Sequence, residues 1–346
     1  MDSVDFRSDT VTWPTPKMRE AMAKAQVGDD VYGEDPTVKA LEQLAADKLG
    51  KAAGLFVASG TQGNLIAALT HTNRGDEIIM GCDAHTFCWE AGGAAVLGGV
   101  TPLPLPTDSL GRMNLAQIEA SIRGDDPHWP HSRLITVENS SGGNNGAAIP
   151  ANYFAAIRQL SDRHQLRVHL DGARLFNAAT ALSVEAKEIA QHVDSASICL
   201  SKGLCAPVGS VLVGDRSFIH QARRYRKLLG GGMRQAGVLA AAGLIALETM
   251  SQRLGEDHLK AQRLAQGIAT VSGLVIDPSV VQTNMVFFTL ADTVPLTAQE
   301  LVNKVWQTAE IKLGTYGDRK LRAVTHYWIQ PDHVDALVNT LKAVLK

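Results

Sequence analysis

The sequence predicts an α/β fold, with a mostly parallel sheet flanked by helices and a smaller α+β unit at the C-terminal end. From about residue 54 to residue 213, short apolar runs alternate with segments whose apolar residues recur at helical spacing. A chain of 346 residues favours more than one unit, and a hydrophobic content of 45% supplies a large core. We expect an N-terminal arm over residues 1–15, a large domain over 16–250 and a small domain over 251–346.

The first elements are an arm and two helices. A helix is expected to begin at Pro16, because proline is favoured in the first turn. A polar loop over residues 28–36 separates it from a second helix, 37–49, in which Val38 and Leu41 share a face.

The middle of the chain carries the strands of the expected sheet. In order they cover 54–58, 77–80, 101–105, 133–137, 166–170, 195–200 and 209–213. Helical patterns between them cover 64–71, 115–122, 152–164 and 183–192. This alternation favours parallel strands with helices on both faces. The last strand follows its predecessor by a short connection, so we expect the two to be antiparallel neighbours.

The remaining segments predict two long helices and a small α+β unit. The helices cover 235–250, which is rich in small residues, and 256–271, which is richer in charge. A strand over 283–290, a helix over 297–309, a strand over 320–325 and a helix over 331–345 complete the chain.

Charge and composition exclude several classes of protein. The net charge is −2, and the densest basic cluster, 223–227, is too short to indicate a nucleic-acid surface. The longest apolar run, 236–247, falls short of the roughly 20 residues that span a membrane. The four cysteines form no CxxC pair, and the first residues are polar and acidic rather than a signal peptide. We therefore expect a cytoplasmic protein.

The most informative residues are Asp171 and Lys202. Each follows an apolar strand pattern and precedes a glycine, so both are expected at the edge of the sheet rather than on a solvated surface. A lysine can condense with an aldehyde, and a carboxylate can pair with a protonated pyridine nitrogen. These are the groups that hold and activate pyridoxal 5′-phosphate.

Ser59, Gly60 and Thr61 connect a strand to a helix. The free N–H groups at a helix start favour a phosphate, and the two hydroxyls add donors. Serine and threonine are also ordinary helix caps, so this triplet alone is a weak signal.

Several cationic and imidazole side chains are candidates for the same site. Arg174 is expected to pair with Asp171, to bind a substrate carboxylate or to contact the cofactor ring oxygen. His85 follows a strand and has the flat ring needed to stack on a cofactor, although a lone histidine is more often structural. His128 lies in a loop, where it is either a general base or a solvated side chain.

A glycine-rich segment, 230–232, precedes Arg234. Three glycines permit close backbone approach, and Arg234 or Lys227 has the reach to bind an anion, including one across a subunit interface. The plainer interpretation is a flexible link between two helices.

Together these residues resemble the L-threonine aldolase family (low-specificity and L-allo-threonine aldolases) of fold-type-I pyridoxal phosphate enzymes. The resemblance covers nearly the whole chain. Its matching stretches are 6–12, 28–36, 59–61, 169–177, 197–203, 206–210, 230–235, 282–285 and 322–326.

The resemblance implies a role for each matching residue. Lys202 would bind the cofactor covalently, Asp171 would contact the ring nitrogen and His85 would stack on the ring. Ser59, Gly60 and Thr61 would bind the phosphate. The substrate carboxylate would be bound by Ser8, Arg174 and Arg322, with Arg174 also near the cofactor. Arg234, with Lys227 near the same interface, would reach the phosphate of a neighbouring subunit, which implies a homotetramer.

One segment departs from the family pattern. Members often carry Thr-His-Asn-Gly after the Glu-Asn pair, whereas Glu138 and Asn139 are followed here by Ser-Ser-Gly-Gly-Asn-Asn-Gly over 140–146. The missing histidine bears on how the loop and substrate are positioned, and on stereochemical preference.

The implied reaction is cleavage of a β-hydroxy-α-amino acid, such as L-threonine or L-allo-threonine, to glycine and an aldehyde. His85 and His128 are the candidates for the base that removes the hydroxyl proton. Other pyridoxal phosphate reactions, namely β-elimination and transamination, remain alternatives, as does a non-catalytic regulator that binds the cofactor. A dinucleotide-dependent dehydrogenase is disfavoured because no G-x-G-x-x-G follows the first strand.

Overall fold

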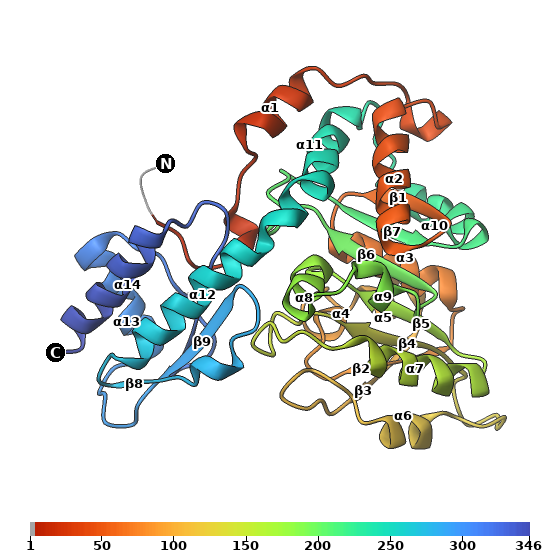
Figure 1. Cartoon of the computed structure of the whole chain (residues 1–346). Coiled ribbons are helices and arrows are strands. Elements are labelled where there is room, and N and C mark those ends of the chain that lie inside the picture. The colour runs from red at the N-terminus through yellow and green to blue at the C-terminus, as the bar shows by residue number, and fades with distance from the viewer. Residues whose placement is uncertain (1–3) are drawn as a thin grey trace.

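The computed structural model of this chain describes residues 4–346 and confirms the predicted α/β fold (Figure 1). The large sheet has the strand order β1-β7-β6-β5-β4-β2-β3. Its strands are β1 (Ala53–Val57), β2 (Glu77–Gly81), β3 (Thr101–Leu105), β4 (Ser132–Glu138), β5 (Arg167–Asp171), β6 (Ser195–Cys199) and β7 (Ser210–Gly214).

Most of this sheet is parallel, as predicted. The strands β3, β2, β4, β5 and β6 are parallel to one another, and β7 pairs antiparallel with both β6 and β1. The antiparallel pairing expected for the last strand is therefore confirmed. The carboxyl ends of parallel strands meet at one edge, where α/β proteins place their ligands. Asp171 ends β5 at this edge, and Lys202 follows β6.

Helices cover both faces of the sheet because its strands are apolar on both sides. In β1, Phe56 packs with α2 in one core, whereas Leu55 and Val57 pack with α3 and α10 in another. The helices of this part are α1 (Pro16–Ala23), α2 (Pro36–Leu49), α3 (Gly60–His71), α4 (His85–Cys88), α5 (Gly93–Gly98), α6 (Leu115–Ser121), α7 (Ala151–Arg163), α8 (Leu175–Leu182), α9 (Ala186–Ala190), α10 (Arg216–Leu228) and α11 (Gly237–Glu248).

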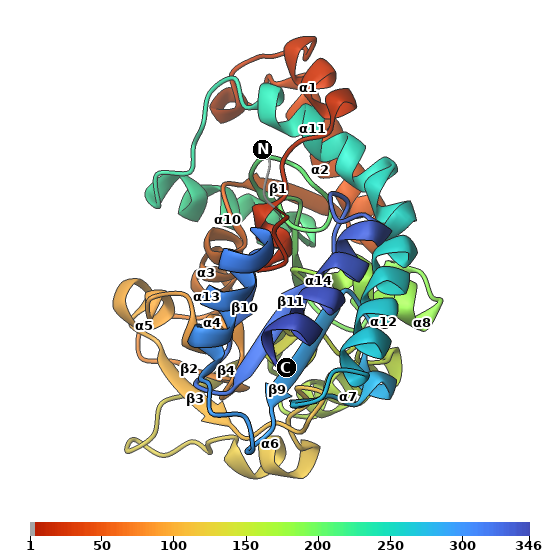
Figure 2. The same cartoon turned by 90° about the vertical axis from the view of Figure 1, so that its left-hand side faces the viewer.

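The C-terminal part forms a second sheet with its own core. Its strands lie in the order β10-β11-β9-β8, with helices along the sheet (Figure 2). The elements are α12 (Leu254–Ala269), β8 (Leu274–Val275), β9 (Met285–Leu290), α13 (Ala298–Ala309), β10 (Gly314–Thr315), β11 (Lys320–Val324) and α14 (Pro331–Val344). The exact domain boundaries stay a prediction.

The N-terminal arm contacts both parts of the molecule. Phe6 is fully buried in the second core, and Trp13 stacks on Trp328 with ring centroids 4.5 Å apart. Thr12 Oγ1 donates a hydrogen bond to the backbone oxygen of Lys202, at 2.7 Å. The arm therefore fixes the loop that carries Lys202 relative to the C-terminal unit.

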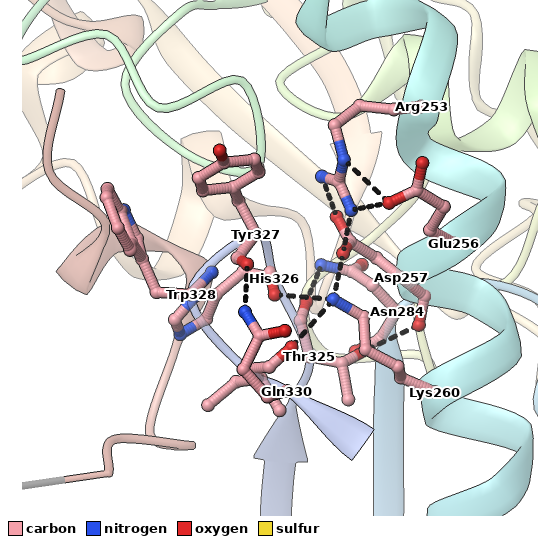
Figure 3. A network of polar contacts seen from close by, with 12 residues as sticks. Arg253, Glu256, Asp257, Lys260, Asn284, Thr325, His326, Tyr327, Trp328 and Gln330 are labelled. Atoms are coloured by element: carbon pink, nitrogen blue, oxygen red, sulfur yellow. Dashed lines mark hydrogen bonds and ion pairs between the residues drawn. The ribbon is translucent and has the colours of Figure 1, made fainter. Parts of the chain in front are cut away.

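A buried polar network anchors α12 to the rest of the C-terminal unit (Figure 3). Asp257 is fully buried, and its carboxylate lies 2.7 Å from Arg253 Nη2 and 2.8 Å from Lys260 Nζ. Thr325 Oγ1 donates to the backbone oxygen of Asp257 at 2.7 Å, and Lys260 donates to the backbone oxygen of His326 at 2.9 Å. The ammonium group of Lys260 and the hydroxyl of Thr325 thus connect α12 to the segment that follows β11, and Arg253 pairs with Asp257 at the start of the helix.

Several helices differ from the sequence prediction, and the short helices α4, α5 and α8 were not predicted. The helix expected over 183–192 is the shorter α9, preceded by α8, because Ser183 adopts a positive φ of 55° and separates the two. The helix α3 begins at Gly60, earlier than expected, since Ser59 caps it through Gln62 N–H. The basic helix α10 was not predicted, because few of its residues are apolar.

None of the helices within residues 4–346 combines the length and apolar character that a membrane span requires.

Gly54 in β1 is required for the close approach of α2. A Cβ atom at Gly54 would lie 2.5 Å from the backbone oxygen of Glu42, and backbone cannot move aside as a side chain can. We expect Gly54→Ala to lower the free energy of unfolding by about 1–3 kcal/mol, as overpacking does. Urea denaturation followed by circular dichroism measures this.

Gly124→Ala is the matched control, because a Cβ atom there meets no heavy atom of the described chain within 4 Å. It should change stability by less than about 0.5 kcal/mol. Equal stability of the two variants would contradict the proposed steric role of Gly54.

Candidate active site

A cleft of about 420 Å³ lies at the carboxyl edge of the large sheet, where the C-terminal unit faces it. This volume is typical of a small-molecule site. Side chains from both parts of the molecule line it, among them Ser8, His85, Glu138, Arg174, Lys202, Tyr316 and Arg322. Five of the sequence-predicted substrate and cofactor residues therefore meet in one cleft, namely Ser8, His85, Arg174, Lys202 and Arg322.

Asp171 and Lys202 occupy the predicted positions at this edge. The carboxylate of Asp171 is buried and accepts hydrogen bonds from Asn64 Nδ2 at 2.9 Å and from Ala173 N–H at 3.1 Å. Lys202 is partly buried, and its side chain lines the cleft. An amine and a carboxylate are thus available beside the same cavity.

His85 is half-buried at the start of α4 and is held by a second carboxylate. Its Nδ1 lies 2.8 Å from Glu90 Oε1, which also accepts from Asn64 Nδ2 at 2.8 Å. The hydrogen bond with Glu90 raises the pKa of His85 above its ordinary value. Polar atoms of His85, Glu90 and Asp171 all lie within 4.8 Å of one another. This spacing would suit a metal ion, but the hydrogen bonds of Asn64 and His85 to the two carboxylates already explain it.

Arg174 reaches the cleft from a buried ion pair with Asp9. Its Nε and Nη2 donate to the two carboxylate oxygens at 2.8 and 2.6 Å. Burial by itself would raise the pKa of Asp9, but the guanidinium of Arg174 outweighs burial and holds that pKa well below its usual range. The pair fixes the guanidinium plane of Arg174 and leaves Nη1 for other partners.

Arg322 on β11 brings a second guanidinium to the same place. A Cβ atom on Gly142 would lie 3.6 Å from Arg174 Nη1 and 4.0 Å from Arg322 Nη1. Burial, and then the charge of Arg174, lowers the pKa of Arg322. Two guanidinium groups that face one cavity favour an anionic ligand, because a carboxylate there would offset their mutual repulsion.

The start of α3 has the features of an anion site. The side chain of Ser59 accepts from Gln62 N–H at 3.1 Å, whereas the first N–H groups of a helix have no partner inside it. A Cβ atom at Gly60 would lie 2.9 Å from Cys199 Sγ at the end of β6, so the absence of a side chain lets the helix start sit against this edge. The glycine at 231 packs against the side chain of Gln62.

Glu138 is a carboxyl group of the cleft that sequence reasoning did not identify. It ends β4 in register with Asp171 on β5, and it accepts from the backbone N–H groups of His85 at 2.9 Å and Gly142 at 3.2 Å. Loss of hydration, followed by the charge of Asp171, raises the pKa of Glu138 to about 7. Glu138 is therefore a group in the cleft that titrates near neutral pH.

The segment 140–146, which departs from the family pattern, closes one side of the cleft with backbone atoms. Gly142 O accepts from Arg322 Nη1 at 3.3 Å, and Asn144 Nδ2 donates to Asp83 at 2.6 Å. Thr283 Oγ1 donates to Gly146 O at 2.7 Å. The segment is thus attached to both parts of the molecule and covers Arg322.

The other predicted residues lie outside this cleft in the single chain. His128 is 85% exposed, and its Nδ1 lies 2.7 Å from Asp126. Lys227 lines a separate surface depression beside α10, and Arg234 is exposed with its Nη1 2.8 Å from Asp29.

Sequence reasoning also missed Asp9, Asn64 and Glu90. Asp9 lies in a stretch that carries the family resemblance, 6–12, but its pairing with Arg174 joins residues 165 positions apart. Asn64 is 107 positions from Asp171. One available signal was that Asn64 and Glu90 stand beside runs of small and apolar residues.

Comparison with known proteins identifies the family. The family model described as beta-eliminating lyase matches residues 5–292. The chain is 44% identical over 339 residues to low-specificity L-threonine aldolase 1 of Arabidopsis thaliana, covering 96% of this chain and 94% of that protein. It is 47% identical over 284 residues to the low specificity L-threonine aldolase of Escherichia coli, covering 82% and 84%.

A solved structure supports the fold. The threonine aldolase of Leishmania major superposes with a TM-score of 0.83 at 21% identity, covering 99% of this chain and 100% of that one. The likeness extends through both sheets.

The raised pKa of Glu138 predicts that the free energy of unfolding depends on pH. The carboxyl ionises near 4.5 when unfolded and near 7 when folded, so its contribution to stability is present below about pH 4.5 and is lost as the pH rises through 7. Glutamine cannot ionise. Between pH 4.5 and 8, we expect the unfolding free energy of the wild-type apoprotein to fall relative to Glu138→Gln by about 2 kcal/mol, with allowance for partial exposure.

Urea unfolding of both proteins across this pH range measures the difference. The exposed Glu34→Gln is the control, and its curve should run parallel to that of the wild type. A Glu138→Gln curve that also runs parallel to the wild type would show that Glu138 titrates normally.

Proposed function

We propose that this chain, which belongs to the beta-eliminating lyase family, is a lyase that cleaves L-threonine and L-allo-threonine to glycine and an aldehyde. Relatives that match it over most of their length carry the name L-threonine aldolase. The observation that carries the proposal is the convergence of Lys202, Arg174 and Arg322 on one cleft beside Asp171. This set binds the carboxylate of an amino acid next to a reactive amine.

Pyridoxal 5′-phosphate fits the residues that are present. Lys202 offers an amine for its aldehyde, Asp171 a buried carboxylate for its ring nitrogen, and the start of α3 an anion site for its phosphate. We assign phosphate binding to Ser59, Gly60 and Thr61. When bound, this cofactor supplies an electron sink for the negative charge left on the α-carbon when the Cα–Cβ bond breaks.

The two arginines orient the substrate. We assign its carboxylate to Arg174 and Arg322, with the hydroxyl of Ser8, which also lines the cleft, as a further donor. Asp9 holds Arg174 in a single orientation through two hydrogen bonds. A carboxylate fixed from two sides restricts rotation of the amino acid, so that the breaking bond is held in one direction.

Proton transfer from the β-hydroxyl requires a base, and His85 is the better placed candidate. It lines the cleft, and its Nδ1 is engaged by Glu90, which leaves Nε2 to accept a proton. The raised pKa of His85 means that this nitrogen becomes free of its proton at a higher pH. His128 is exposed in this chain and would act only in the cleft of a neighbouring subunit, directly or through water.

A homotetramer accounts for the predicted residues outside the cleft. We propose that Arg234 and Lys227, which are exposed here, contribute to the phosphate site of a neighbouring subunit. A cytoplasmic location stays a prediction from the cysteine content.

Cleavage of both threonine diastereomers tests the function. With cofactor present, the purified protein should release acetaldehyde from L-threonine and L-allo-threonine, detected by a coupled dehydrogenase, with glycine as the second product. Lys202→Ala should lose about 1,000-fold or more in turnover, because the covalent attachment is lost. Lys17→Ala, at an exposed position on α1, is the control. A keto acid in place of glycine would indicate transamination or β-elimination instead.

Arg322→Gln tests the carboxylate assignment. Loss of one charged donor should raise KM for threonine about 10- to 100-fold, with a smaller effect on cofactor affinity. Steady-state kinetics and cofactor titration measure the two effects separately. Lys304→Gln, exposed on α13, should leave both unchanged. An unchanged KM in Arg322→Gln would assign the substrate carboxylate elsewhere.

A further inference from the structure

A buried series of hydrogen bonds runs from the end of α3 to the carboxylate of Asp171. Ser195 Oγ lies 2.8 Å from His71 Nε2 and 2.9 Å from His169 Nδ1. His169 Nε2 lies 3.0 Å from Asn64 Oδ1, and Asn64 Nδ2 lies 2.9 Å from Asp171 Oδ2. Side chains from α3, β5 and β6 thus form one continuous path behind the cleft.

The orientation of the Asn64 amide follows from its neighbours. Its nitrogen faces Asp171 Oδ2 at 2.9 Å and Glu90 Oε1 at 2.8 Å, and carboxylate oxygens accept hydrogen bonds. Both amide hydrogens are therefore used, one for each carboxylate. The amide oxygen must then face His169, whose Nε2 has to carry a hydrogen in order to donate to it.

The remaining hydrogens along the path are fixed in turn. Burial lowers the pKa of His169 to about 3 and that of His71 to about 4, so both rings are neutral at pH 7. A neutral ring that donates through Nε2 accepts at Nδ1, so the hydroxyl of Ser195 donates to His169. The oxygen of Ser195 then accepts from His71 Nε2. Every donor along the path points toward Asp171.

The same amide also reaches His85. Glu90 Oε1, which accepts from Asn64, lies 2.8 Å from His85 Nδ1. The side chain of Asn64 on α3 therefore donates to two carboxylates. One is Asp171, which is assigned to the cofactor ring nitrogen, and the other is Glu90, which orients the imidazole of His85. Two like-charged carboxylates are kept close together by donors placed between them.

We propose that Asn64 is a positioning residue that sets the relative placement of Asp171 and His85 around the cofactor, and that His169, Ser195 and His71 hold its amide in the required orientation. Its significance for catalysis rests on the proposed function, whereas the orientation of the hydrogen bonds does not. Each hydrogen bond of the series has a single possible assignment of donor and acceptor, which distinguishes it from a buried polar cluster whose hydrogen bonds can reverse.

The first test needs no substitution and no activity. Nitrogen-15 NMR of the histidines in the apoprotein reports which ring nitrogen carries hydrogen. We expect His169 and His71 to be neutral Nε2–H tautomers that do not titrate between pH 5.5 and 8. The signals are assigned with His169→Gln and His71→Gln. An Nδ1–H tautomer of His169, or titration of its ring near pH 6.5, would overturn the proposed orientation.

The second test removes the donor. Asn64→Leu should weaken binding of pyridoxal 5′-phosphate by about tenfold or more, the loss expected for a hydrogen bond to a charged group. It should also change the absorption maximum of the bound cofactor and the pH dependence of that band. Asn64→Asp should do so more strongly, since it brings a third carboxylate to Asp171 and Glu90.

Thr70→Val on the same helix is the matched control, because within residues 4–346 the only hydrogen bond of Thr70 Oγ1 is the one to Ile66 O of its own helix. It should keep the cofactor affinity and spectrum of the wild type. An Asn64→Leu protein that folds and keeps both would overturn the positioning role. A wild type that binds cofactor and shows the predicted tautomers but releases no aldehyde would refute the proposed function and leave this inference standing.

Discussion

The buried ion pair between Asp9 and Arg174 joins three segments that are far apart in sequence. Asp9 belongs to the arm and Arg174 follows β5, while Asn284, just before β9, donates to Asp9 at 3.3 Å and to the backbone oxygen of Thr325 at 3.1 Å. A buried charge is tolerated only where an opposite charge and hydrogen bonds replace its contacts with water, and the two hydrogen bonds between Arg174 and Asp9 do so. The cleft exists because this pair fixes the arm, the large sheet and the C-terminal unit together.

The parallel sheet explains why the cleft is rich in carboxyl groups. Glu138 and Asp171 end adjacent strands in register, and parallel pairing leaves their side chains at the same edge. Asp171 accepts a hydrogen bond from the side-chain amide of Asn64, whereas Glu138 accepts from the backbone N–H groups of His85 and Gly142. Loss of hydration and the nearby Asp171 raise the pKa of Glu138 to about 7, so this edge of the sheet carries a carboxyl group that titrates near neutral pH.

The sequence predicted the strands of the large sheet because most of them are short apolar runs buried on both faces, and it pointed to Asp171 and Lys202 because each ends or follows such a run. It did not predict the two-residue strands β8 and β10, which are too short to leave a pattern. It did not predict Asn64, Glu90 or Asp9, since their roles depend on hydrogen bonds between distant residues that leave no periodic pattern. The helix α10 was not predicted for a different reason. Its buried face is narrow, and its many basic residues leave few apolar residues from which a helical spacing can be recognised. Local sequence patterns indicate where helices and strands form, whereas the residues of the site come together only when helices and strands that are distant in sequence pack against one another.

The placement of the arm has a consequence for how the protein is made. Its residues leave the ribosome before those of both sheets, yet Phe6 packs in a core that includes Leu341, and the backbone oxygen of Arg7 accepts from Arg322, 315 positions later. Contacts of such long range form late, because the intervening chain must be ordered before its ends can meet. During synthesis the large sheet can assemble before the arm has its partners. The substrate-binding side of the cleft is completed only after the strands of the C-terminal unit have left the ribosome.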